Sequence, residues 1–431
     1  MKYKILLVLV IVLVLGWAVF FRAQPQHSSG PTVVKFAIWG GVAEREAWAA
    51  LAEDFHRKNP GIVIKTQMIP VKYDEKIMAM LAAKTAPDII NLPFGEFASK
   101  GMLNKVLLPI DEYMAQDKNL DLDDLFPGIL ALDQWKGTQY SIAHALGPQV
   151  LFYNVDHLRE ARLPTPNEFY QRGEWDWPTF LECCKKLVKR DAKGKVTRWA
   201  YVRYTPIWTY ISLNGGRTFN EDYTECYFDD PKVYEAIQMV ADLFLVHGVM
   251  PPPALEKEIG KWQAFARGDA SMFISGPWQV SRLKNMEDEY DIAPPPTAPG
   301  GRSITLGGRI GGIWRGTRVP EAAYRWISYL ATPDARRIWS RLGFDIPALK
   351  SLASHPEEWT DPEIIPAHFH VFYDLAPSIL KPPLAVNPFI PKKAERLINS
   401  TMDLIWVGRK SAKEGLIEII PEVNRILRTG T

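Results

Sequence analysis

Residues 32–39 read TVVKFAIW, a run of β-branched and aromatic residues that predicts a buried strand. The glycine pair at 40–41 ends this strand. A helix is expected from Glu44, because Trp48 and Phe55 then lie on one face at helical spacing. A strand followed directly by an amphipathic helix is the unit from which α/β folds are built.

The next fifty residues repeat this unit. IVIK at residues 62–65 predicts a second strand, a second helix is expected from Tyr73, and PDII at residues 87–90 predicts a third strand. This β-α-β-α-β order implies a parallel sheet covered by helices, with ligands bound beyond the carboxyl ends of the strands. Those ends are residues 39–44 and 91–96.

Composition limits the class of protein. A chain of 431 residues with 47% hydrophobic residues can bury the cores of two domains. Its 51 basic residues exceed its 49 acidic ones by only two, so no positive surplus favours nonspecific binding to nucleic acid. We therefore expect a globular protein of more than one domain that does not bind nucleic acid.

The three cysteines are Cys183, Cys184 and Cys226. They form no C-x-x-C motif, and neighbouring helical side chains point about 100° apart, so a metal site is not expected. We interpret them as small apolar residues. A disulfide between Cys184 and Cys226 would be compatible with an exported protein, although spacing does not establish it.

The amino terminus predicts export. Two lysines precede an uninterrupted apolar run at residues 5–21, and a polar stretch follows at residues 22–30. The run of 17 residues is long for a signal peptide and short for a membrane span. Cleavage after Ala23 would place bulky Phe21 three residues before the cut, and no cysteine follows for lipid attachment. We expect an uncleaved membrane anchor, with a cleaved signal segment as the alternative.

Residues 265–278, FARGDASMFISGPW, resemble the signature segment of family 1 extracellular solute-binding proteins, the maltose-binding-protein type. Other segments agree with this family in order, although an insertion at residues 167–176 separates two of them. These segments are YNVD at 153–156, LPTP at 163–166, WPTF at 177–180, AAYRWISYL at 322–330 and GFDIPA at 343–348. The resemblance spans roughly residues 32–428.

The resemblance implies an α/β protein with the type II periplasmic-binding-protein fold, in which two lobes close by a hinge around a ligand cleft. Residues 1–30 would be the anchor or signal segment and its linker. Lobe 1 would contain residues 31–143 plus 292–331, and lobe 2 residues 144–291 plus 332–431. The chain would cross between the lobes at residues 140–146, at residues 291–296 and near Thr332.

The same resemblance implies a function. The chain would be the extracytoplasmic solute-binding component of an ABC importer, a monomeric receptor that captures a sugar and delivers it to the permease subunits in the membrane. No cofactor, metal or catalytic residue is expected. Two alternatives remain open, a secreted carbohydrate-active enzyme and a ligand sensor that docks on a membrane kinase.

A sugar offers hydroxyl groups and an apolar face, so its pocket needs aromatic platforms and planar hydrogen-bonding side chains. Trp278, after Gly276–Pro277, is the first stacking candidate. The weaker aromatic candidates, each weighed against an ordinary core role, are Trp39, Phe94, Trp208, Tyr210 and Phe389. Among carboxylates we expect Glu44 and Glu96, with a helix-start charge as the alternative role of Glu44.

The glycine-rich stretch at residues 307–312 lets the backbone approach a ligand closely, and it contains the candidates Gly308 and Arg309. Its spacing does not match a dinucleotide-binding motif. His368 and His370 flank Phe369 and would share one face of a strand, which favours a surface role over a metal site. No H-E-x-x-H or G-x-S-x-G motif supports the enzyme alternative.

Overall fold

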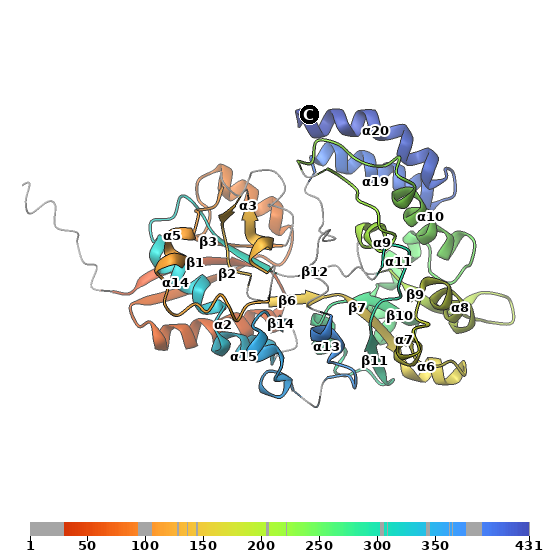
Figure 1. The fold of residues 1–431 in the computed structure, drawn as a ribbon, viewed down its shortest axis with the longest axis horizontal. Coiled ribbons are helices and arrows are strands. Elements are labelled where there is room, and N and C mark those ends of the chain that lie inside the picture. The colour runs from red at the N-terminus through yellow and green to blue at the C-terminus, as the bar shows by residue number, and fades with distance from the viewer. Residues whose placement is uncertain are drawn as a thin grey trace, which may run out of the picture.

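The computed structural model describes residues 30–93, 106–126, 129–135, 137–143, 145–203, 207–220, 222–301, 306–307, 309–341, 345–361, 363, 365–375 and 390–430. Two α/β lobes lie side by side along the long axis of the molecule (Figure 1). Among the described residues, no helix has the length and apolarity needed to cross a bilayer. The apolar run at residues 5–21 lies outside the described residues.

The first lobe contains a four-stranded sheet of order β13-β3-β1-β2. Its strands are β1 (Thr32–Ile38), β2 (Ile62–Met68), β3 (Ile89–Pro93) and β13 (Arg309–Ile313). The first three are parallel, as the sequence predicts, and β13 runs antiparallel to β3. Its helices are α2 (Val42–Lys58), α3 (Tyr73–Ala82), α5 (Asp111–Gln116), α14 (Pro320–Leu330) and α15 (Pro333–Ser340).

The second lobe contains a five-stranded sheet of order β11-β7-β10-β9-β8. Its strands are β7 (Val150–Asn154), β8 (Lys189–Arg190), β9 (Val196–Val202), β10 (Ala270–Ser275) and β11 (Tyr290–Ala293). The helices are α6 (Val155–Glu160), α7 (Pro166–Gln171), α8 (Trp177–Leu187), α9 (Ile207–Leu213), α10 (Pro231–Leu245), α11 (Pro253–Ile259), α12 (Trp262–Ala266), α13 (Trp278–Leu283), α19 (Lys392–Trp406) and α20 (Ala412–Thr429).

All three cysteines lie in the apolar core of this second lobe. They are buried and free, so the interpretation as small apolar residues is confirmed and the possible disulfide between Cys184 and Cys226 is not formed. Burial raises the pKa of the Cys183 and Cys226 thiols to about 11.

A three-stranded sheet of order β12-β6-β14 lies between the lobes (Figure 1). Its strands are β6 (Ala145–Pro148), β12 (Leu306–Gly307) and β14 (Ile346–Pro347). Both β12 and β14 pair with β6 in antiparallel register. Each passage of the chain from one lobe to the other contributes one strand to this bridging sheet. The first passage reaches β6 within the expected range.

The expected second crossing at residues 291–296 is wrong, because these residues still belong to the second lobe. Residues 290–293 form β11. Beyond it, the carbonyl of Pro294 accepts a hydrogen bond from Trp175 Nε1 at 2.9 Å, and the Thr297 amide donates to the carbonyl of Trp175 at 3.0 Å. The crossing therefore occurs later, at β12.

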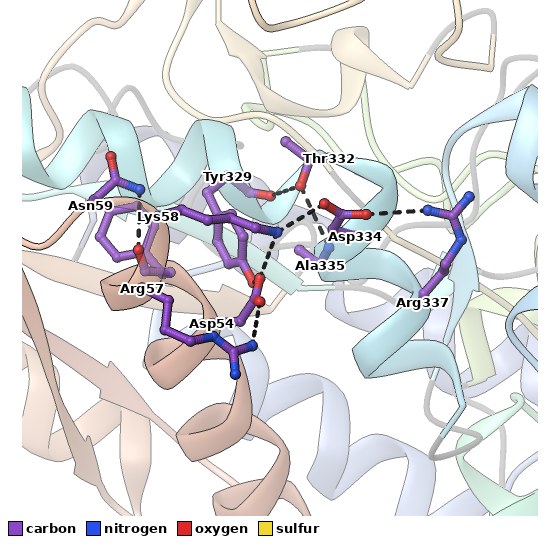
Figure 2. A network of polar contacts seen from close by, with 10 residues as sticks. Asp54, Arg57, Lys58, Asn59, Tyr329, Thr332, Asp334, Ala335 and Arg337 are labelled. Carbon is purple, nitrogen blue, oxygen red and sulfur yellow. Dashed lines mark hydrogen bonds and ion pairs between the residues drawn. The ribbon is translucent and has the colours of Figure 1, made fainter.

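The third crossing also lies later than expected. Helix α15 follows Thr332 but packs on α2 of the first lobe, where the rings of Trp339 and Trp48 are 4.5 Å apart. Lys58 Nζ lies 2.8 Å from Asp334 Oδ2 and ties the same two helices together (Figure 2). Residues 333–340 therefore belong with lobe 1, and the chain crosses at β14.

Among the described residues, β14 is followed by the short helical elements α16 (Lys350–Ala353), the 3₁₀ helix η3 (Pro356–Glu358) and α17 (Val371–Asp374). His368 and His370 directly precede α17 and are not on a strand, so that expectation is wrong. His368 Nδ1 instead contacts the buried carboxylate of Asp291 on β11, which attaches this segment to the second lobe. The described part of the chain also contains the 3₁₀ helix η2 (Leu130–Asp133) and the hairpin of β4 (Gln134–Trp135) and β5 (Thr138–Gln139).

Candidate functional site

The ligand-facing edge of the first sheet is set by strand direction. The parallel strands β1 and β3 end at Ile38 and Pro93. Because β13 is antiparallel, it begins at this edge, with Arg309 opposite Pro93. The chain enters β13 from β12 of the bridging sheet, so this edge of lobe 1 adjoins the bridging sheet.

The second sheet presents its corresponding edge to the same bridging sheet. Strands β9 and β10 are parallel and end at Val202 and Ser275. Strand β7 is antiparallel to β10 and begins at Val150, opposite Ser275. Since β7 follows β6 directly, both ligand-facing edges meet at the bridging sheet (Figure 1).

At the lobe 1 edge, Trp39 is half-buried directly after β1, and its ring meets that of Tyr73 edge-on at 5.1 Å. Glu44 is 8% exposed, and its Oε2 accepts a hydrogen bond from the Gly41 amide at 2.8 Å. Glu44 thus performs the helix-start role that the sequence left as its alternative. Gly40 has a φ of +133°, and a β-carbon there would lie 2.8 Å from Glu44 Cβ, so this turn requires glycine.

At the lobe 2 edge, Trp278 is half-buried and begins α13, directly beyond β10. Its ring covers Gly276, where an added β-carbon would come within 2.3 Å of the ring atoms. The neighbouring Gln279 donates from Nε2 to the Ser275 hydroxyl at 3.0 Å. Its buried Oε1 has no hydrogen-bond partner within the described part of the chain. The lobe 2 edge therefore carries the indole of Trp278, which packs against Gly276, beside the buried amide of Gln279.

Trp208 and Tyr210 lie on α9, but they do not face the same way. Trp208 is half-buried and lines a cavity of about 130 Å³ between α9, α10, α19 and α20. Tyr210 is fully buried, its hydroxyl 2.6 Å from that of Tyr201. Successive helical residues point about 100° apart, so residues two apart face nearly opposite sides. The structure places the Tyr210 ring in the core.

The cavity beside Trp208 brings in residues that sequence reasoning missed. Arg203 follows β9 directly, and its guanidinium lies 5.5 Å from the centre of the Trp406 ring. Asn399, on α19 with Trp406, is exposed at the cavity. The sequence does mark Arg203, because it is the charged residue directly after the apolar end of β9, WAYV at residues 199–202. Trp406 has no such signal, because only tertiary packing brings α19 over α9.

The Arg203 backbone is held by a buried carboxylate. Its amide donates to Glu256 Oε1 at 2.8 Å, and Glu256 is 4% exposed. The guanidinium lies 4.0 Å from Glu256 Oε2, and Lys261 Nζ lies 3.9 Å from the same oxygen. Burial raises the pKa of Glu256 and lowers that of Lys261, although each charge favours the other.

Other candidates have no described side chain. Phe94, Glu96, Gly308 and Phe389 lie outside the described residues, and Arg309 is described only through its backbone in β13. The described residues contain no group of three side chains that could hold a metal ion. A larger hollow of about 670 Å³, lined by residues including Thr32, Lys58 and Arg318, lies at the opposite edge of the first sheet.

Comparisons with known proteins agree with this architecture. The maltotriose-binding protein of Pyrococcus abyssi is 23% identical over 343 residues, which cover 77% of this chain and 70% of that protein. The arabinooligosaccharide-binding protein of Bacillus subtilis is 22% identical over 356 residues, covering 79% and 78%.

Solved structures share the two-lobed fold. An ABC substrate-binding protein from Listeria monocytogenes in complex with cycloalternan superposes with a TM-score of 0.79 at 21% identity, covering 92% of this chain and 99% of that one. The sugar-binding protein MalE of Xanthomonas citri gives a TM-score of 0.74 at 22% identity, covering 93% and 98%. The sequence profile of the bacterial extracellular solute-binding proteins matches residues 40–337. The chain therefore belongs to the family of bacterial extracellular solute-binding proteins.

Proposed function

We propose that this protein captures a sugar or oligosaccharide between its two lobes and delivers it to the permease of an ABC importer. The observation that carries the proposal is the meeting of two edges that bear half-buried indoles. Trp39 lies at the lobe 1 edge and Trp278 at the lobe 2 edge, while Trp208 lines the cavity between the helices of lobe 2. Relatives whose names state maltotriose and arabinooligosaccharide binding support a saccharide as the solute.

The mechanism follows from the two-lobed arrangement. An indole offers a flat apolar surface to the C–H face of a sugar, while amides and guanidinium groups bind hydroxyls. A solute that contacts both edges binds the closed form better than the open form and shifts the population toward closure. The lobes move as bodies, and the strands of the bridging sheet are where the chain passes between them. The permease would recognise the closed form.

The direct test is a melting experiment on the full chain in mild detergent, followed by intrinsic tryptophan fluorescence. The panel contains maltotriose, arabinotriose, galactooligosaccharides, sugar phosphates and polyols. A solute that binds only the native state raises the melting temperature with concentration, because binding stabilises that state by mass action. We expect a saturable shift with at least one saccharide and loss of that shift in Trp278→Ala.

Trp314→Ala is the matched control. Trp314 is also half-buried, but it follows β13 at the opposite edge of the first sheet, so its loss should lower stability without removing the ligand shift. We also infer that the protein is a receptor and not an enzyme. Recovery of the bound saccharide intact supports this inference, whereas its cleavage would contradict it. A panel without any saccharide hit would contradict the proposed function.

We further propose that residues 5–21 hold the protein at the outer face of the cytoplasmic membrane as an uncleaved anchor, and that the receptor is monomeric. The support is the length of the apolar run and the bulky Phe21, which would lie three residues before a cut after Ala23. Mass spectrometry of the membrane fraction tests the anchor. An intact amino terminus is expected, and a mature protein starting near residue 24 would contradict it.

A further inference from the structure

Arg203, which lines the cavity beside Trp208, belongs to a group of two cations and one carboxylate. Arg203 and Lys261 both approach Glu256, at 4.0 and 3.9 Å from the same carboxylate oxygen. One buried carboxylate cannot neutralise two cations, so this group carries one positive charge in excess. Among the described residues that line the cavity, the other polar one, Asn399, is neutral.

Among the described residues, the contact between the Arg203 guanidinium and Glu256 leaves the N–H donors of Arg203 available. At 4.0 Å the guanidinium is beyond hydrogen-bonding distance of Glu256, so the two groups do not form the forked pair that arginine makes with a carboxylate. One face of the guanidinium lies over the Trp406 ring. A planar cation covered on its face offers its N–H groups along its edge, and Arg203 lines the cavity.

The low solvent exposure of the site strengthens the effect of the positive charge on Arg203. The side chain of Glu256 is 5% exposed and that of Arg203 is 19% exposed, so little water screens them. In such a site an ionised acceptor forms a shorter hydrogen bond than a hydroxyl does, and one roughly twice as strong. The apolar lining of the cavity includes Trp208, Phe228 and Trp406, which would flank a sugar ring or its substituent.

We propose that this cavity receives an anionic group of the solute, so that the preferred solute is an acidic saccharide, bearing a carboxylate or a phosphate. Arg203 would bind the anion through its guanidinium edge, and Trp208 would lie against the attached sugar. The proposal rests on the proposed function, because it names the solute class of the same receptor. It adds Arg203, Trp406 and Asn399 to the ligand-contacting residues.

The test compares charged and uncharged forms of one sugar on the full chain in detergent, by calorimetry at low and at moderate salt. The probes are glucuronate, its methyl ester, glucose 1-phosphate and glucose, together with the uronate counterpart of any neutral saccharide found in the melting screen. We expect the acidic form to bind at least about tenfold more tightly at low salt, with the advantage shrinking as salt rises. The uronate and phosphate arms tell the two anions apart.

Arg203→Met should remove the preference for the acid, so that the acidic and neutral forms of the sugar bind with equal affinity. Arg203→Lys keeps the charge but not the fork, so it should retain the salt dependence with a smaller preference. Arg282→Met is the matched control, because the Arg282 guanidinium also lies over an indole, 5.8 Å from Trp262, but does not line this cavity.

Equal affinity for acidic and neutral forms in the unmutated protein would overturn this inference and leave the proposed function standing. An acid preference that survives Arg203→Met would also overturn it. Failure of every saccharide, neutral or acidic, would instead remove the proposed function on which the inference rests.

Discussion

His157, on α6, shows how burial sets the chemistry of one side chain. Its Nδ1 lies 3.0 Å from the Ser271 hydroxyl, and its Nε2 lies 3.6 Å from Asp288 Oδ2. Burial, assisted by the nearby cation Arg198, lowers the pKa of His157 from 6.5 to about 4. The folded protein therefore holds this imidazole neutral down to acidic pH.

The first prediction is a loss of stability in acid that His157 causes. The folded pKa lies below the unfolded one, so the stabilisation is complete above pH 6.5 and is lost as the pH falls toward 4. A shift of this size corresponds to about 3 kcal/mol of unfolding free energy. Urea unfolding at pH 7 and pH 4.5 should show a smaller difference in His157→Gln than in the unmutated protein. The exposed His370→Gln is the control, and equal differences in all three proteins would refute the prediction.

Trp208 and Tyr210 show that residue type alone does not tell whether an aromatic side chain lines a cavity or lies in the core. Both aromatics were candidates for ligand contact, yet one lines a cavity and the other bonds to Tyr201 in the core. Aromatic residues bury large areas in either role, so composition does not separate the two. The direction of the side chain on α9, and the elements packed around that helix, make the difference.

At the scale of elements, a charge network holds α2 to α14 and α15 (Figure 2). Burial opposes ionisation of Asp54, but hydrogen bonds from Lys58, Tyr329 and Arg57 lower its pKa to about 2. Lys58 also bonds to Asp334 at the start of α15. The network continues from Arg337, which donates to Glu358 of η3 at 2.6 Å. These contacts hold α15 on the first lobe. The third crossing between the lobes therefore comes after α15, at β14.

The second prediction concerns the start of α20. The Ser411 hydroxyl accepts a hydrogen bond from the Glu414 amide at 3.2 Å, and Glu414 Oε2 accepts from the Ser411 amide at 3.1 Å. This reciprocal cap satisfies two backbone donors. Ser411→Ala should lower the unfolding free energy by about 1 kcal/mol in urea titrations.

Ser400→Ala provides the comparison. Ser400 is exposed within α19, and its hydroxyl bonds back to the Arg396 carbonyl. Because alanine is the best helix former, this change should alter stability by less than about 0.5 kcal/mol. A loss in Ser411→Ala no greater than that in Ser400→Ala would show that the cap does not stabilise α20.

At the scale of the whole molecule, the third prediction is that ligand draws the lobes together. Fluorescent labels at Glu46→Cys on α2 and Arg409→Cys after α19 report the separation of the lobes, since both positions are exposed. The native cysteines are buried with raised thiol pKa values, so they should react slowly with the labels. Energy transfer should increase at saturating solute.

A pair of labels within lobe 1, at Glu46→Cys and Glu321→Cys, should show no change, because each lobe moves as a body. An unchanged signal from the pair across the lobes, with solute bound, would mean that capture does not involve closure.

The local framework of the first lobe could be predicted from the amino-acid sequence. The strands at residues 32–38 and 62–68, the helices after them and their parallel order follow from apolar periodicity, which is a property of neighbouring residues. The segment at residues 265–278 and the five other segments that resemble the family indicated membership, because they occur in the same order as in that family. The interpretation of the cysteines as small apolar residues likewise followed from their spacing and apolar setting, but that Cys184 and Cys226 are unpaired did not.

The positions at which the chain crosses between the lobes, and the residues that line the second-lobe cavity, could not be predicted from the sequence. The proline-rich stretch at residues 291–296 suggested a crossing, but hydrogen bonds to Trp175 keep it on the second lobe. Arg203 and Trp406 are 203 positions apart in the sequence numbering, and α19 must pack over α9 before they meet. The physical reason is that periodicity records which face of an element is buried, whereas the partner of that face depends on packing between segments distant in sequence.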